Sequence, residues 1–204
     1  MKKTRRETFS GRCEVCRINK PLCFCSHIPV IENKVEVIVV MHYSERWLTS
    51  NTAYFAKLVL RNSKIIERGN LDSPMTTEEF SKDGRTYLYL FPTEDSRPVE
   101  EFEGNIEDAI LVVPDGSWSK AKKFHKREQC LKTLPKYHLS NVGVSNYQLR
   151  KSPGENFLCT YEAIAKALGV LEGKKTESEM LSFFNIFVDR VLRSRRGEQS
   201  ISNL

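Results

Sequence analysis

The feature that most restricts the fold of this chain is a nearly continuous apolar run at positions 35–41, Val-Glu-Val-Ile-Val-Val-Met. A strand with one wet face alternates apolar and polar residues, whereas a strand that is apolar throughout is covered on both faces, as in parallel sheets flanked by helices. Further short strands are predicted at 63–67, 85–91 and 109–113. The sequence therefore predicts an α/β fold with a mostly parallel sheet between helices.

Helices are predicted between these strands and after them. The segment 49–60 has Ala53, Ala56 and Leu60 on one side, with Ser50 or Asn51 as its cap. Thr176-Glu177-Ser178-Glu179 is a capping-box pattern, which predicts that a final helix opens there and runs to about Arg193. The other predicted helices cover 76–79, 118–130 and 160–170.

Four of the six cysteines stand within thirteen positions. Thiolates at this density suit a closed, tetrahedral structural zinc site, and a gap of two residues is the usual spacing of a zinc knuckle. An iron–sulfur cluster, redox thiols and unligated cysteines are the alternatives, and His27 is an alternative ligand. We predict a zinc knuckle over 1–30 and a main domain over 31–204, with these zinc ligands: Cys13, Cys16, Cys23 and Cys25.

The remaining two cysteines, Cys130 and Cys159, lie far from this cluster. Cysteine outside a ligand set behaves as a small apolar residue, so both are predicted to be buried structural residues.

Charge is unevenly distributed along the chain. Lys and Arg number 32 and Asp and Glu 26, which gives a net charge of +6. The segment 67–108 is acidic, whereas 120–136 and 190–196 are basic. This segregation favours a polyanionic partner such as a nucleic acid, the alternative being a solvated surface that happens to be basic.

No segment approaches the roughly 18 consecutive apolar residues of a membrane span. The basic start of the chain is followed by the mostly polar stretch Glu7-Thr8-Phe9-Ser10, where a signal peptide would have an apolar run. We therefore expect a cytoplasmic protein without membrane association. The sequence sets no oligomeric state.

The strand predicted at 109–113 runs directly into Pro114-Asp115-Gly116-Ser117-Trp118 and then into a basic helix. Ligands of open α/β sheets lie outside the carboxyl ends of the strands, so a carboxylate beside a helix N-terminus at this point forms a candidate reactive corner. Asp115 is the candidate catalytic residue, and capping of the following helix is its alternative role. Trp118 either stacks on a base or packs against the sheet.

The ten glycines form neither a G-x-G fingerprint nor a phosphate-binding loop. A nucleotide-like cofactor would therefore need a different cradle.

Five blocks of this sequence together resemble one known family. Asp115-Gly116-Ser117-Trp118 is similar to an Asp-x-Thr-Trp signature, and Ser117 keeps the hydroxyl of the usual threonine. On this basis the chain resembles the DTW-domain family of tRNA-uridine aminocarboxypropyltransferases over residues 13–170. The other matching blocks are the cysteine knuckle, His42-x2-Glu45 with Ser50-Asn51-Thr52, Phe91-Pro92, and Leu149-Arg150 with Thr160-Tyr161-Glu162-Ala163.

The resemblance implies a SPOUT-like, knotted α/β fold and an unusual use of S-adenosylmethionine. In the family, the 3-amino-3-carboxypropyl group passes to N3 of a tRNA uridine and methylthioadenosine is released. Asp115 is then expected to be the base that takes the N3 proton. Glu162 would meet the cofactor's ammonium group or, alternatively, serve the dipole of its own helix. The residues expected to bind the cofactor are Ser117, Trp118, Thr160, Glu162 and Pro92.

Contacts with tRNA are expected from the basic helix that begins at the reactive corner and from the family block around Arg150. His42 and Glu45 follow the first strand's carboxyl end and either line the site or make local hydrogen bonds. The knuckle and the basic N-terminus would add a second grip on folded tRNA. The full set of expected RNA contacts is Lys122, Lys123, Lys126, Arg127, Arg150, His42 and Glu45.

Three other functions stay open on the sequence alone. The first is a SPOUT-type RNA methyltransferase, which would transfer the methyl group of the same cofactor. The second is an aminocarboxypropyltransferase that acts on rRNA. The third is a zinc-containing RNA-binding protein without catalytic activity.

Overall fold

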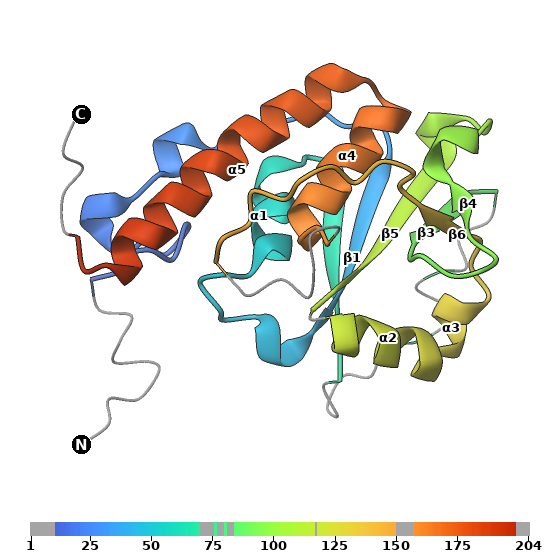
Figure 1. The fold of residues 1–204 in the computed structure, drawn as a ribbon, viewed down its shortest axis with the longest axis horizontal. Helices are drawn as coiled ribbons and strands as arrows, with labels where there is room; N and C mark the ends of the chain where they lie inside the picture. The colour runs from blue at the N-terminus through green and yellow to red at the C-terminus, as the bar shows by residue number, and fades with distance from the viewer. Residues whose placement is uncertain are drawn as a thin grey trace.

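The computed structural model describes residues 11–69, 76, 80, 84–116, 118–149 and 157–198. Its centre is a six-stranded sheet with the strand order β2-β1-β5-β3-β6-β4, in which every strand pair is parallel (Figure 1). The strands are β1 (Glu36–His42), β2 (Ser63–Arg68), β3 (Thr86–Leu90), β4 (Arg97–Pro98), β5 (Ala109–Asp115) and β6 (Lys136–His138).

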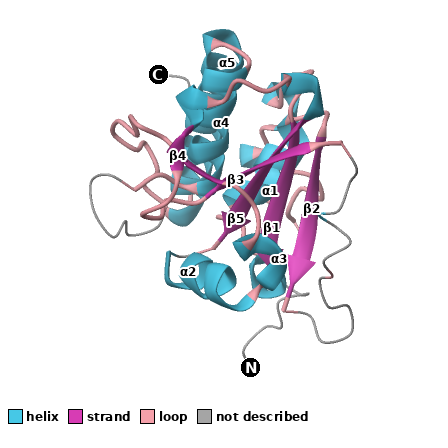
Figure 2. Ribbon diagram, turned by 90° about the vertical axis from the view of Figure 1, so that its right-hand side faces the viewer, coloured by secondary structure: helices cyan, strands magenta, loops and turns pink. Residues whose placement is uncertain are grey.

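Helices cover both faces of the sheet. One face carries α1, α4 and α5, and the other carries α2 and α3, an arrangement that Figures 1 and 2 show from two sides. The predicted α/β fold with a parallel sheet and flanking helices is therefore confirmed. The helices are α1 (Thr52–Val59), α2 (Trp118–Arg127), α3 (Gln129–Lys132), α4 (Thr160–Leu171) and α5 (Lys174–Arg195), and short 3-10 turns include η2 (Lys20–Leu22), η3 (Cys25–His27) and η4 (Tyr43–Glu45).

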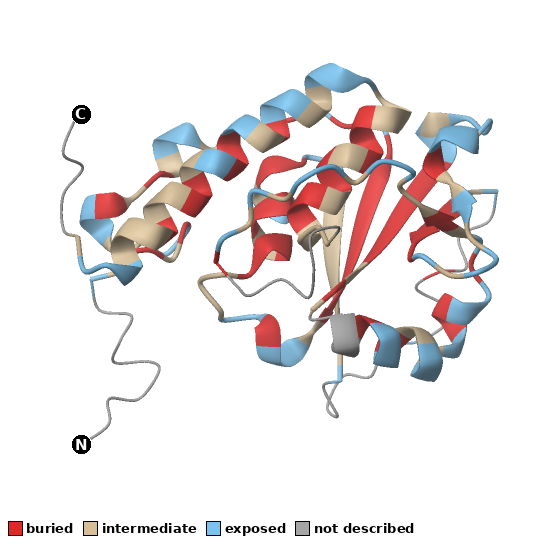
Figure 3. Cartoon of the chain, in the orientation of Figure 1, coloured by how far each residue is buried: buried red, intermediate tan, exposed pale blue. Residues whose placement is uncertain are grey.

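The alternation of side chains along β1 explains its continuous apolar sequence. Val37 and Val39 pack with the helices of one face, whereas Ile38 and Val40 pack with α2 and α3 on the other. Successive side chains of a strand point to opposite faces, so both sets must be apolar when both faces are covered. Figure 3 shows β1 and β5 buried along most of their length, while the edge strand β2 is only half-buried.

The N-terminal segment packs against the last helix although the two are far apart in the sequence (Figure 1). The ring of Phe24 lies 5.7 Å from that of Phe55 in α1 and 6.1 Å from that of Phe187 in α5. Asn19 Nδ2 also donates to Ser194 Oγ at 3.3 Å. The cysteine-rich segment is thus anchored on the face of the sheet that carries α1 and α5.

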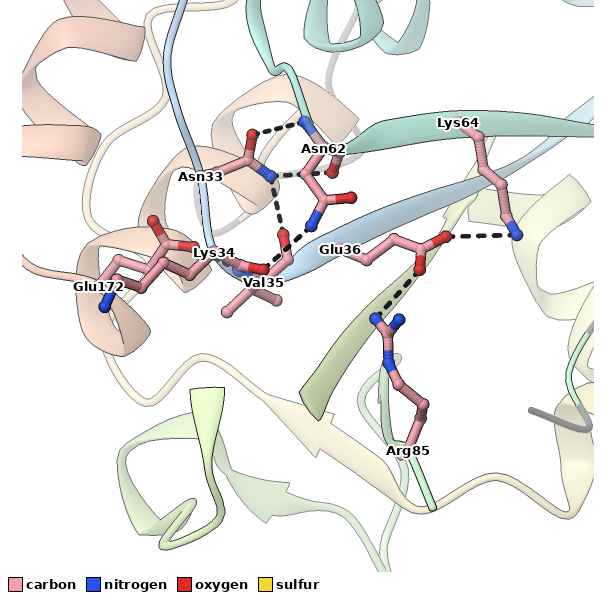
Figure 4. A network of polar contacts seen from close by, with 8 residues as sticks. All are labelled: Asn33, Lys34, Val35, Glu36, Asn62, Lys64, Arg85 and Glu172. Carbon is pink, nitrogen blue, oxygen red and sulfur yellow. Dashed lines mark hydrogen bonds and ion pairs between the residues drawn. The ribbon is translucent and has the colours of Figure 1, made fainter. Parts of the chain in front are cut away.

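A polar network holds the amino end of β1, opposite the candidate site (Figure 4). Asn33 Nδ2 donates to the carbonyls of Val35 and Asn62, at 2.7 and 2.9 Å. Glu172 Oε1 accepts from the Val35 amide at 2.7 Å. The buried carboxylate of Glu36 pairs with two cations, at 3.3 and 3.0 Å, which are Lys64 and Arg85.

Two helix predictions are corrected by the structure. The helix predicted at 118–130 breaks at Glu128, whose backbone is extended and whose carboxylate accepts from Arg68 Nε at 2.8 Å. The last helix opens at Lys174, after a turn in which Gly173 has a φ of +109°, and not at the predicted capping box. Glu177, the second residue of that box, points back to α4, where a Cβ on Gly169 would collide with the Glu177 side chain.

Other differences concern the shortest elements. Strands β4 and β6 were not predicted, because two- and three-residue strands carry no periodic signal. Of the helix predicted at 76–79, residues 77–79 lie outside the described part. None of the described helices is long and apolar enough to cross a membrane.

Candidate active site

Strands β1 and β5 bring the candidate site together at their carboxyl ends. They are neighbours in the sheet, and Met41 is paired with Asp115, the last residue of β5. The chain that leaves β1 through η4 therefore passes beside Asp115. The parallel pairing is the physical reason why blocks more than sixty positions apart meet here.

Asp115 is 5% exposed, and its contacts with the described residues include hydrogen bonds from two neutral donors. Thr160, the first residue of α4, donates from Oγ1 to Asp115 Oδ1 at 2.7 Å. Asn51 Nδ2 lies 3.4 Å from Oδ2. Buried carboxylates require such hydrogen bonds, and here the two bonds also fix the plane of the group.

Asn51 connects three parts of this site. Its Oδ1 accepts from the Tyr54 amide at 2.9 Å and so caps α1, as predicted. Its Nδ2 also contacts the carbonyl of Glu45 at 3.0 Å and the sulfur of Met41 at 3.1 Å. Asn51 was not predicted as a site residue, because an asparagine before a helix is already explained as a cap. Its place in the Ser50-Asn51-Thr52 block was the available signal.

Glu162 is 3% exposed and is occupied within the protein. Its Oε2 accepts from Ser145 Oγ at 2.7 Å and from the Cys159 amide at 3.0 Å, and its Oε1 accepts from the Asn146 amide at 2.8 Å. The carboxylate thus closes the capping box of α4 and fastens the segment around 145 to it. A contact from Glu162 to the cofactor stays a prediction.

Cys159 serves as the N-cap of α4 and is half-buried. Its Sγ accepts from the Glu162 amide at 3.5 Å, so sulfur fills a capping role that serine performs more often. Burial raises the pKa of this thiol well above its usual value. Cys130, in contrast, is buried among apolar residues, as predicted.

His42 and Glu45 lie at the rim formed by η4. His42 Nδ1 accepts from the Ser44 amide at 3.2 Å, and a Cβ added to Gly69 would lie 2.8 Å from Nε2. Glu45 is buried. Both residues are thus near the carboxyl end of β1, and their contact with RNA stays a prediction.

Pro92 follows β3 and is exposed, next to an aromatic cluster. The imidazole of His125 in α2 stacks at 4.8 Å on Phe91 and at 6.0 Å on Tyr89. Burial lowers the pKa of His125. Among the described residues, His125 Nδ1 and the Tyr89 hydroxyl are buried polar atoms without a hydrogen-bond partner.

The basic residues of α2 lie on its outer surface. Ala121 and Phe124 are buried against the sheet, and the four cationic residues between and after them are exposed: Lys122, Lys123, Lys126 and Arg127. This surface is available to a polyanion, as the RNA prediction requires. Ser117 and Arg150 lie outside the described residues, as does the side chain of Trp118.

The four N-terminal sulfurs converge within 4.8 Å of one another. Cys13 Sγ lies 3.4 Å from Cys25 Sγ, and Cys16 Sγ lies 3.6 Å from Cys23 Sγ. Four sulfurs bound at about 2.3 Å to a tetrahedral zinc ion would be about 3.8 Å apart. The cluster therefore fits a zinc ion in both donor chemistry and size, and His27 is exposed and does not belong to it.

The thiols of this cluster differ in acidity. Burial alone would raise the pKa of Cys13, but hydrogen bonds from the Cys16 backbone and the Cys25 thiol lower it to about 6. Burial raises the pKa of Cys16 to about 11. Four neighbouring thiolates repel one another, so full ionisation of the cluster requires a cation between them.

A protein-family model described as DTW domain matches residues 10–192 of this chain. The chain belongs to the DTW domain family. The resemblance stated above from the five sequence blocks is therefore confirmed. Asp115, Asn51 and Thr160, which meet in the structure, come from three different blocks of that resemblance.

Individual proteins show the same relationship. The chain is 29% identical over 181 residues to tRNA-uridine aminocarboxypropyltransferase 2 of Drosophila melanogaster, covering 80% of this chain and 68% of that protein. It is 27% identical over 207 residues to tRNA-uridine aminocarboxypropyltransferase A of Arabidopsis thaliana, which covers 83% of this chain and 76% of that protein. With the mouse tRNA-uridine aminocarboxypropyltransferase 2 the identity is 24%, and this chain spans 59% of that protein.

A solved structure of similar shape is that of the SAM-dependent rRNA:acp-transferase Tsr3 from Vulcanisaeta distributa. The TM-score is 0.49 and the identity 14%, over 81% of this chain and 85% of that one. A likeness of this size carries no argument about topology, so the knotted SPOUT-like connection stays a prediction.

Proposed function

We propose that this DTW domain protein transfers the 3-amino-3-carboxypropyl group of S-adenosylmethionine to N3 of a uridine in tRNA. The observation that carries the proposal is the convergence of Asp115, Asn51 and Thr160 at the carboxyl end of the sheet. The names of the relatives from fly and Arabidopsis support the substrate and the transferred group.

Asp115 is the residue that we assign to proton removal. Uridine N3 carries a proton that must leave before or during attack, and a carboxylate within hydrogen-bond reach can accept it. Of the contacts described for Asp115, the one at Oδ1 is the shorter, at 2.7 Å, and the one at Oδ2 is the longer, at 3.4 Å. We therefore propose that Oδ2 accepts the proton from uridine N3, while the hydrogen bond from Thr160 to Oδ1 keeps the carboxylate oriented.

The residues around Asp115 fit S-adenosylmethionine in charge. When bound, this molecule supplies an electrophilic carbon beside a sulfonium leaving group, together with an ammonium and a carboxylate. Asp115 offers a buried negative charge for the cationic part. Pro92, at the end of β3, would lie against an apolar part.

The exposed cations of α2 are proposed to hold the RNA backbone. This helix follows Asp115 after two residues, so phosphates bound along it would run toward the site. Each contact would add to affinity and to its salt dependence without reading sequence.

A product analysis tests the proposal. Purified protein is incubated with unmodified tRNA and S-adenosylmethionine, the RNA is digested, and the masses of its nucleosides are measured by mass spectrometry. We expect uridine that is heavier by one aminocarboxypropyl group, and one equivalent of methylthioadenosine. A methylated nucleoside would instead show that the protein is a methyltransferase. An aminocarboxypropyl product on rRNA but not on tRNA would show that the substrate is rRNA.

A further inference from the structure

The turn that follows β1 exposes two aromatic side chains near the candidate site. Tyr43 is 49% exposed and Trp47 is 51% exposed, whereas most large apolar side chains of the described chain are buried. Exposed aromatic side chains next to a site are typical of contact surfaces, because ring burial on binding is favourable.

Two arginines lie against the Trp47 ring. The guanidinium carbon of Arg46 is 4.9 Å from the ring centroid, and that of Arg17 is 5.4 Å from it. Arg17 also lies 3.4 Å from the ring centroid of Tyr54. The exposed tryptophan is therefore embedded in a cationic stack, which we call the Trp47 stack (Arg17, Arg46, Trp47 and Tyr54).

The stack joins the cysteine knuckle to the turn after β1. Arg17 follows the ligand Cys16 and has a φ of +62°, a left-handed conformation that non-glycine residues rarely adopt. Its NH1 donates to the Arg46 carbonyl at 2.7 Å, and the Tyr54 hydroxyl donates to the Val15 carbonyl at 2.8 Å. The knuckle thereby holds the stack in place before any partner binds.

The same turn is linked to Asp115 through the side chain of Asn51. The carbonyl of Glu45 accepts from Asn51 Nδ2, and that amide also lies against Asp115 Oδ2. Trp47 stands between Glu45 and Asn51 in the sequence. A ligand that rests on the stack therefore lies on the turn that contacts Asp115 through Asn51.

We propose that the Trp47 stack binds an unpaired base of the RNA substrate, next to the uridine that enters the site. Unpaired RNA bases stack on aromatic rings and on guanidinium planes, and the flanking cations complement the phosphates of the same nucleotides. Arg46 Nε also lies 3.4 Å from Glu67 Oε1 in a partly exposed ion pair, so the two arginines and this carboxylate leave a net positive charge for the phosphates. The inference rests on the proposed function in so far as it takes RNA as the substrate.

Binding measurements test this surface directly. The probes are a fluorescein-labelled oligouridylate of about 12 nucleotides and a blunt RNA duplex of the same length. We expect Trp47→Ala to weaken binding of the single strand by about tenfold or more, and binding of the duplex little. Trp47→Phe should keep most of the affinity. The matched control is Val30→Ala, because Val30 is 63% exposed and precedes β1.

A crosslinking experiment gives a second readout. Oligouridylate that carries 5-iodouracil is irradiated with the full-length protein, and the adduct is located by mass spectrometry. An adduct on Trp47 supports the stack. Equal affinity of Trp47→Ala and wild type for the single strand, with the adduct elsewhere, overturns it.

Failure of the proposed function would look different. If the wild-type protein binds the oligouridylate through Trp47 but yields no aminocarboxypropyl product on tRNA, the Trp47 stack is supported and the proposed reaction is wrong. If wild type and Trp47→Ala modify tRNA with the same KM and bind the single strand equally, the proposed reaction is supported and the role of the Trp47 stack is wrong.

Discussion

The hydroxyl of Thr160 donates a 2.7 Å hydrogen bond to Oδ1 of Asp115, across 45 positions of sequence. Thr160 is the first residue of α4 and Asp115 the last residue of β5, so this bond ties the helix start to the strand end. A bond to an ionised carboxylate is stronger than one between neutral groups. It gives the proposed base a fixed orientation.

Removal of this hydroxyl should slow the reaction. Thr160→Val keeps the shape of the side chain but leaves Oδ1 without its donor, and a hydrogen bond to a charged group is worth about 1.5–3 kcal/mol. We expect kcat to fall by about tenfold to a hundredfold. Thr160→Ser retains the hydroxyl and should stay near wild type. Equal rates for the valine and serine variants would contradict a positioning role.

The cysteine cluster should bind one zinc ion per chain. Cys23→Ser removes one thiolate from a set whose sulfurs all lie within 4.8 Å, and should lower both the zinc content and the midpoint of thermal unfolding. Metal content is measured by mass spectrometry after gel filtration. Cys130→Ala is the control, since it removes a thiol outside the cluster. A wild-type protein that contains no zinc and has the same melting temperature as Cys23→Ser would contradict the zinc site.

The layered core was accessible from the sequence because burial on two faces leaves a continuous apolar run. Strand β1 was predicted for that reason, and Asn51, which caps α1, was one of the two caps expected for that helix. The start of α5 was missed. Thr176 and Glu179 have capping-box spacing, but the turn at Gly173 and the contact of Glu177 with α4 set the N-cap three residues earlier, at Gly173.

The candidate site was less accessible. Asp115 follows from its place after a buried strand, yet nothing in its local sequence indicates that Thr160 and Asn51 hold it. Those contacts depend on the order of parallel strands and on where α4 begins. The resemblance supplied Thr160 as a site residue, whereas the role of Asn51 required the three-dimensional contacts.

Glu162 should contribute to stability through its local hydrogen bonds. Glu162→Gln places an amide where one of three donors now points, and a buried donor left unsatisfied costs about 1–3 kcal/mol. We expect the free energy of unfolding in urea to fall by that order. Glu179→Gln, at a site 46% exposed on α5, should change it by less than about 0.5 kcal/mol. Unchanged stability with weakened S-adenosylmethionine binding would instead assign Glu162 to the cofactor.

Glu172 should make stability depend on pH. Burial raises the pKa of Glu172, although hydrogen bonds from the Val35 and Lys34 amides partly oppose this. The folded protein thus holds this proton more tightly than the unfolded chain does. Its contribution to stability is full below the unfolded pKa of about 4.3 and is lost as pH rises through the folded pKa.

Glu172→Gln tests this directly because the amide keeps an acceptor for the Val35 N–H and carries no charge. We expect the variant to gain stability relative to wild type as pH rises from about 4 to about 7. Urea denaturation across that range gives the difference at each pH. A flat difference, or one of opposite slope, would contradict the burial effect.

Asp115 is proposed to remove the N3 proton of the target uridine. The most direct measurement is the single-turnover rate of aminocarboxypropyl transfer to tRNA by Asp115→Asn, with the exposed Asp95→Asn as control. We predict a loss of about a hundredfold or more for Asp115→Asn with unchanged tRNA binding, and a loss of stability of no more than about 1–3 kcal/mol, because the new amide nitrogen faces a donor such as Asn51 Nδ2. An Asp115→Asn protein that transfers the group at a rate close to wild type would show that Asp115 is not the base.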